Sequence, residues 1–135
     1  MRSSLAWWLV CTIVAVAALA VGYAAYVLRE DERIERRAAV LAQGDPQRGP
    51  DAMLRYGCGG CHDIPGVRGA RGLAAPSLAR FGVRAYIAGE LRNTPDNLVQ
   101  WIAHPHGIEP KTAMPDMGVG DRDAHDIAAY LYTLQ

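Results

Sequence analysis

The most reactive group of side chains in the sequence is Cys58-Gly59-Gly60-Cys61-His62. Two thiols three residues apart can each form a thioether bond with one vinyl group of a haem, while the adjacent imidazole reaches the haem iron. The spacing therefore predicts covalent attachment of one haem c per chain through Cys58 and Cys61, with His62 as an axial ligand of the iron.

Two other kinds of site use closely spaced cysteines. A structural zinc site needs a second pair of ligands, but the remaining cysteine, Cys11, lies in a long apolar run, where we interpret it as a buried apolar residue. A thioredoxin-like redox pair would follow a strand and would have no ligand histidine directly after it. Haem attachment fits the sequence better than either alternative.

Haem iron in such a site usually takes a second axial ligand, and several residues downstream could supply it. The histidines are expected at the surface, because His104 and His106 flank a proline in a polar turn and His125 lies among acidic residues. From the residues alone the candidates stay open: Met114, Met117, His104, His106 and His125.

The motifs after the haem site follow a recognisable order. They are Ala75-Pro76-Ser77-Leu78, Pro105, Pro110-Lys111-Thr112-Ala113-Met114-Pro115, and a final helix containing Ala129-Tyr130-Leu131. Together with the Cys58 to His62 motif they resemble a class I cytochrome c over about residues 44–135. The resemblance implies an all-α fold, a small helical haem domain preceded here by one N-terminal transmembrane helix.

The same resemblance implies roles for residues of the haem pocket. Met114 matches the methionine that is the sixth iron ligand of the family, and Trp101 matches an aromatic residue on the methionine side of the haem. The carbonyl of Pro76 matches the acceptor for the second nitrogen of the ligand histidine, which needs such a partner to fix its tautomer. The haem propionates also need partners, which Thr112, Arg80, Arg84 and Tyr86 could supply, while a solvated surface position is an equal alternative for the two arginines.

Two helices are expected to close the haem domain. The first should begin with Asp45 as N-cap and Pro46 as first helical residue, and the last should have Asp121 as N-cap. The resemblance implies that a glycine and an aromatic residue meet where these helices cross, and Gly49 and Tyr130 match that pair. Met53 departs from the family, in which an aromatic residue is common at that position.

An apolar run precedes this domain. Residues 5–28 contain no charged side chain, and as a helix they would be about 36 Å long, which is enough to span a bilayer. Aromatic residues at both ends suit the interfaces. A cleaved signal peptide is the alternative, since Ala18-Leu19-Ala20 could be cut, but the run is longer than a typical signal core. We predict an uncleaved anchor over residues 1–28.

A charged stretch, residues 29–43, links the anchor to the haem domain, residues 44–135. It is rich in helix formers and pairs Glu32 with Arg36, so we expect a helical stalk that ends at Gly44. Its arginines, counted alone, would place the domain in the cytoplasm. Covalent haem attachment requires maturation on the other side, so we predict a single-pass protein of the plasma (inner) membrane whose haem domain faces the periplasm.

The composition restricts the function further. With 135 residues, 14 basic and 14 acidic side chains and a pI near 6.9, the chain has the size of one ordinary domain and no basic patch for nucleic acid. A six-coordinate iron offers no open position, and no acid-base pair or nucleophile accompanies it. We therefore expect an electron-transfer protein rather than an enzyme, with no small-molecule substrate.

The predicted partners are the membrane and redox proteins of a respiratory chain. We expect single electrons to pass from a quinol-oxidising complex or a dehydrogenase to a terminal oxidase. One alternative is a fixed haem subunit of such a complex. Another is a haem-based gas or redox sensor in which Met114 leaves the iron and a small ligand takes its place.

Overall fold

A computed structural model describes residues 2–135, with side chains from Trp7 onward; the predicted flank at Met1 lies outside this range. The apolar run and the charged stretch form one helix, α1, Arg2–Ala42. Its length and composition make it a candidate membrane span, a test that a signal sequence would also pass. The expectation that the stalk continues the helix is confirmed.

The chain divides into two compact units, the first ending at Ile34 and the second comprising Glu35–Gln135. The second unit therefore includes the last two turns of α1. Its other elements are short: α2 (Gly49–Arg55), the 3-10 helices η1 (Cys58–Gly60) and η2 (Phe81–Val83), β1 (Tyr86–Ile87), β2 (Leu91–Arg92), α3 (Pro95–Ala103), α4 (Pro105–Ile108) and α5 (Asp121–Thr133).

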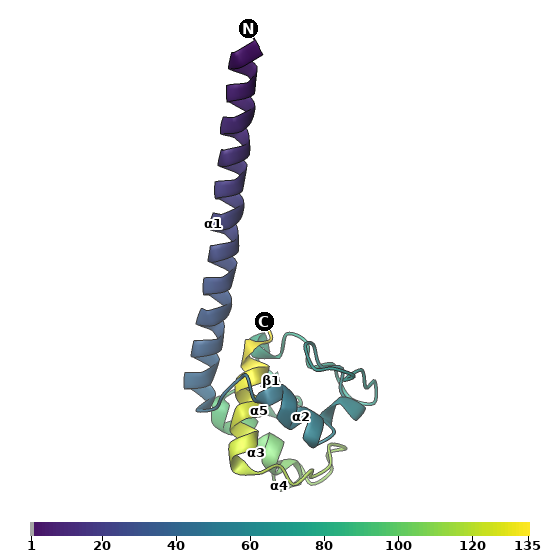
Figure 1. Cartoon of the computed structure of the whole chain (residues 1–135). Coiled ribbons are helices and arrows are strands. Elements are labelled where there is room, and N and C mark those ends of the chain that lie inside the picture. The colour runs from purple at the N-terminus through teal and green to yellow at the C-terminus, as the bar shows by residue number, and fades with distance from the viewer. Residues whose placement is uncertain (1) are drawn as a thin grey trace. The chain divides into compact units, whose positions relative to one another are not determined.

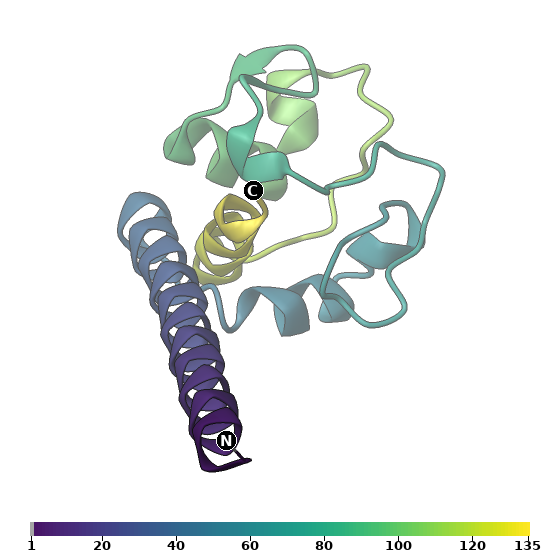
Figure 2. The same cartoon turned by 90° about the horizontal axis from the view of Figure 1, so that it is seen from above.

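Helix α5 is the centre of this second unit. It packs against α2 and against α3, and Figures 1 and 2 show it between these two helices. Its buried stripe, Ala124, Ile127, Ala128 and Leu131, follows the three- and four-residue spacing of a helix face. The only strands among the described residues, β1 and β2, form an antiparallel hairpin with Ile87 opposite Leu91.

The end of α1 differs in detail from the prediction. Gln43, rather than Gly44, adopts the left-handed conformation, with φ of 52°, and the Gly44 N–H donates to the Ala39 carbonyl. This is the hydrogen bond that closes many helix C-termini. Gly44 is needed for another reason, because a Cβ there would lie 2.2 Å from the His125 carbonyl oxygen of α5.

Both predicted N-caps of the closing helices are wrong. Helix α2 begins at Gly49 with Pro50 in its first turn, whereas the Asp45 carboxylate accepts the Gln47 N–H and forms a turn ahead of the helix. Asp45 is held there because its own N–H donates to Asp126, 2.6 Å away. Helix α5 begins at Asp121 itself, with Gly120 as its N-cap residue and no side-chain cap.

Candidate haem-binding site

The cysteine pair lies in one tight turn after α2. Gly57, with φ of 71°, ends the preceding turn, and η1 begins at Cys58. The His62 N–H donates to the Cys58 carbonyl at 3.0 Å, as in one turn of a helix. Neither thiol is in a disulfide, and burial raises the pKa of the Cys58 thiol. The two cysteines and His62 therefore lie within a single turn of the chain.

The tautomer of His62 follows from its hydrogen bond. Its Nδ1 lies 2.7 Å from the carbonyl oxygen of Pro76, the acceptor expected from the sequence. A carbonyl only accepts, so Nδ1 carries the proton and donates. In the neutral imidazole this bond leaves Nε2 as the nitrogen with a free lone pair, which is the one that can bind a metal.

The loop from residue 63 to residue 79 is fastened to this turn by its backbone. Gly72 N–H lies within hydrogen-bond range of the carbonyls of Gly59 and His62, and Ala75 N–H donates to the Cys61 carbonyl at 3.0 Å. A Cβ at Gly72 would lie 2.3 Å from the carbonyl carbon of Cys61, so only glycine permits this approach. The loop and the cysteine turn form one closely packed segment.

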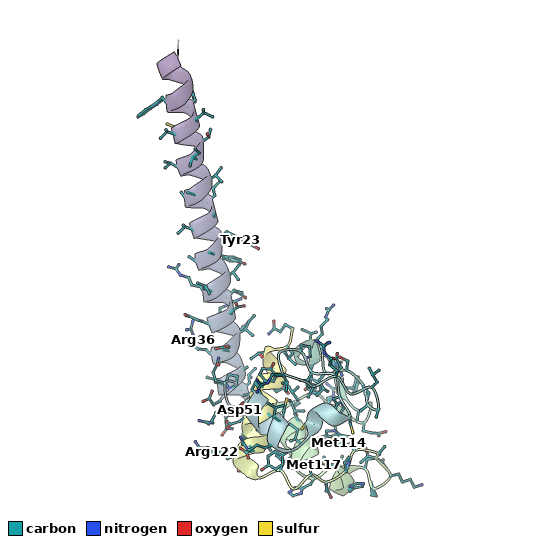
Figure 3. All side chains as sticks on the ribbon, turned by 45° about the vertical axis from the view of Figure 1, so that its right-hand side comes forward. Tyr23, Arg36, Asp51, Met114, Met117 and Arg122 are labelled. Carbon is teal, nitrogen blue, oxygen red and sulfur yellow. The ribbon has the colours of Figure 1, made fainter. Side chains whose placement is uncertain are left out.

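Met114 and Met117, the two methionine candidates for the sixth iron ligand, lie between α4 and α5, and both are labelled in Figure 3. The Met114 side chain is half-buried against the apolar core, and its N–H donates to the Thr112 hydroxyl at 3.2 Å. The Met117 side chain is 42% exposed. Thr112 therefore shapes the turn that presents Met114, in addition to any contact with a propionate.

The three histidines differ from one another. His104 and His106 are both exposed, and His106 Nδ1 lies 3.5 Å from the Asp116 carboxylate. The expectation of a surface position is wrong for His125, which is half-buried and bonded through Nδ1 to the Ala42 carbonyl. The reason is physical: the last carbonyls of α1 have no partner within their own helix and need a donor from elsewhere.

The other predicted pocket residues are also placed. Trp101 is buried in the core, on α3. Arg80 is exposed with φ of 54°, and Tyr86 is exposed on β1. The Arg84 guanidinium donates to the carbonyls of Ser77 and Ala79, so in this structure it stabilises the backbone of residues 77–79.

Several residues with important contacts escaped the sequence argument. Asn93 donates to the carbonyls of Phe81 and Arg84 and accepts from the Tyr132 hydroxyl at 2.9 Å. Burial raises the pKa of Tyr132 to about 12, so it remains a donor at neutral pH. The Ser77 hydroxyl donates to the Asp63 carboxylate at 2.9 Å. No short motif marks Asn93 or Tyr132, and the motif that contains Ser77 does not reveal its partner Asp63, 14 residues earlier.

The residues present fit a covalently bound haem. Two free thiols, one imidazole with an available Nε2 and one half-buried thioether are the donors that such a group uses. The loops that carry them lie on the same side of α5 (Figures 1 and 2). The described residues contain no group of three His, Cys, Asp or Glu side chains that could hold a metal ion.

Comparison with known proteins identifies the family. The model of the cytochrome c family matches residues 46–135. The chain belongs to the cytochrome c family. As a cytochrome c it carries covalently bound haem c and transfers electrons. The all-α fold, with one candidate membrane helix before the cytochrome c domain, is thereby confirmed.

Two curated relatives of this cytochrome c are both named cytochrome c oxidase subunit 2. The protein of Alkalihalophilus pseudofirmus is 33% identical over 116 residues, which is 84% of this chain and 31% of the relative. That of Bacillus sp. strain PS3 is 36% identical over 66 residues, 47% of this chain and 18% of the relative. The chain thus spans about a third or less of their length. No solved structure matches.

Proposed function

We propose that Cys58 and Cys61 form the thioether bonds to the haem and that His62 and Met114 are its axial ligands. The bond from His62 Nδ1 to the Pro76 carbonyl carries this proposal, because it leaves Nε2 for the iron. Met114 is favoured over Met117 by its half-buried position and the bond to Thr112. Trp101 and Thr112 complete the pocket. Bound haem supplies a one-electron couple between ferric and ferrous iron.

The proposed role is electron transfer within a respiratory chain, with no substrate chemistry. Two protein ligands leave the iron without a vacant position, and the chain then only has to hold the same ligands in both oxidation states. Residues 1–28 would anchor the protein in the plasma membrane, and the haem domain, residues 44–135, would face the periplasm. Residues 29–43 would form the stalk, whose last two turns pack with the haem domain. Anchoring raises the effective concentration of the domain near membrane-bound partners.

The proposed electron acceptor is a terminal oxidase, and the donor a quinol-oxidising complex or a dehydrogenase. The names of the two relatives support the oxidase end. They equally support a second arrangement, in which the chain is a fixed haem subunit of such a complex. Both arrangements use the same site and differ in whether the protein leaves its partner.

Mild detergent extraction separates the two arrangements. Native membranes would be solubilised, resolved by size and stained for haem, and the copurifying polypeptides identified. A haem signal in a detergent micelle of one small protein indicates a tethered carrier, and one in a large stoichiometric complex indicates a fixed subunit.

A second experiment tests the sensor alternative by adding carbon monoxide to the reduced protein. A change of the haem spectrum at modest concentration would contradict stable ligation by Met114 and favour a sensor.

A further inference from the structure

A second link between the cysteine turn and the proline loop lies directly beside the bond from His62 to Pro76. The Ser77 hydroxyl lies 2.9 Å from a carboxylate oxygen of Asp63 and 3.3 Å from its carbonyl oxygen. The Leu78 N–H donates to the same Asp63 carbonyl at 2.8 Å. Two consecutive residues, His62 and Asp63, are thus joined to two consecutive residues, Pro76 and Ser77.

This arrangement bears on the ligand because of how a peptide unit is built. The carbonyl that accepts the His62 proton belongs to the peptide unit that joins Pro76 to Ser77, and such a unit is planar. Turning the carbonyl away from His62 would therefore turn the Ser77 backbone as well. Contacts that hold both the side chain and the backbone of Ser77 therefore restrict the direction of the Pro76 carbonyl.

Ser77 is held on several sides. Its hydroxyl donates to Asp63 and accepts the Ala79 N–H at 3.2 Å. Its carbonyl accepts from the Arg84 guanidinium. Ser77 and Asp63 are half-buried, whereas Pro76 is exposed and has no side-chain group that could fix its own carbonyl.

We propose that Ser77 and Asp63 are positioning residues for the axial histidine: their hydrogen bond holds the Pro76 carbonyl in line with His62 Nδ1 and so tunes the haem iron. A strong bond at Nδ1 raises the basicity of the imidazole, and a more basic ligand stabilises ferric iron. Loss of the Ser77 hydroxyl should weaken the bond from His62 Nδ1 to the Pro76 carbonyl. The reduction potential should then rise, which favours ferrous iron. The inference rests on ligation of the iron by His62, as proposed above.

The first experiment compares Ser77→Ala with the wild-type holoprotein. The expected result is a rise of the reduction potential equivalent to about a threefold shift toward ferrous iron, or roughly 28 mV at 59 mV per tenfold. The expected effect is small because Ser77 is not itself the partner of the ligand; loss of a direct partner costs about ten- to a hundredfold in metal affinity or activity. NMR should also show faster solvent exchange of the His62 Nδ1 proton, which a merely structural role of Ser77 would not produce.

The controls separate positioning from general loosening. Ser77→Thr keeps a hydroxyl and should restore both readouts, while Thr133→Ala removes a similar hydroxyl bond, to the Tyr130 carbonyl on α5, and should change neither. If Ser77→Ala fails to take up haem, Asp63→Ala tests the same link. An unchanged potential and exchange rate, or an equal shift in Thr133→Ala, would overturn the proposal. A His62→Ala protein with a wild-type spectrum would instead refute ligation by His62.

Discussion

Gly49 of α2 and Tyr130 of α5 meet so closely that no side chain fits between them. A Cβ at Gly49 would lie 2.3 Å from the Tyr130 Cβ and 2.8 Å from the Asp126 carbonyl oxygen. The Tyr130 hydroxyl in turn donates to the Pro65 carbonyl at 2.6 Å. One aromatic side chain thereby joins the two closing helices to the loop that follows the haem motif.

We expect Gly49→Ala to lower the free energy of unfolding by about 1–3 kcal/mol, because the methyl group must push the two helices apart. Denaturation of the holoprotein, followed by far-UV circular dichroism, measures the change. Gly107→Ala on α4 is the matched control, since its Cβ would meet only the His104 Cβ at an ordinary 3.7 Å. Equal effects of the two substitutions would contradict the close contact at Gly49.

Asp126 is a buried carboxylate that holds the turn before α2. It lies 2.7 Å from Arg48 Nε and accepts the Asp45 N–H, and Arg48 is the main cause of the lowering of its pKa. We expect Asp126→Asn to lower the free energy of unfolding by about 1–3 kcal/mol at pH 7. The loss is moderate because the half-exposed Arg48 can be solvated by water instead. Glu90→Gln, on an exposed turn, should cost almost nothing.

The contribution of Asp126 also has a predictable pH dependence. Its pKa is lower in the folded state than in the unfolded chain, where it is about 3.9. Such a group stabilises the fold above the unfolded value and loses that effect as the pH falls through the folded value. The stability gap between wild type and Asp126→Asn should therefore be constant from about pH 5 to 8 and shrink below about pH 4; a gap that widens in acid would be inconsistent with it.

Met114→Ala should leave the haem attached through Cys58 and Cys61 but remove the thioether ligand. Since methionine with histidine ligation raises the potential, we expect the potential to fall and the ferrous protein to bind carbon monoxide. Potentiometry and carbon monoxide difference spectra measure both effects. Met117→Ala should behave like the wild type; if it loses the ligand instead, the assignment moves to Met117.

The segment that follows the haem motif, residues 63–92, contains five arginines and two acidic residues. Arg68, Arg71 and Arg80 are exposed. We predict that the association rate with an anionic redox partner falls as ionic strength rises, because screening weakens steering. Arg68→Glu should reduce the rate at low salt, and Arg122→Glu on α5 should do so less. A rate independent of salt would rule out electrostatic steering.

The features that the sequence predicted correctly are those that depend on local spacing. The continuation of α1 through its charged residues follows from helix formers that lie a few positions apart. The acceptor for His62, 14 residues away, was found through the family resemblance.

The errors share a different cause. Asp45 was expected to cap a helix, but Asp126, 81 residues later, takes its N–H. His125 was expected in water, but the Ala42 carbonyl, 83 residues earlier, accepts from it. The link from Ser77 to Asp63 went unnoticed for the same reason. Where a side chain could form several local hydrogen bonds, its actual partner depends on tertiary contacts, and no short sequence pattern encodes those contacts.

The last turns of α1 have a practical consequence for anyone who wants a water-soluble form of this cytochrome. Ala38 and Ala42 are 2% and 1% exposed, and Ala42 belongs to the core of the haem domain. A protein truncated to begin at Gly44 would lack these alanines, so the part of the core that they cover would be exposed. It would also leave the His125 imidazole without the Ala42 carbonyl as acceptor. A truncated protein that begins at Glu35 keeps both, so it should express and stay monomeric where the shorter one aggregates.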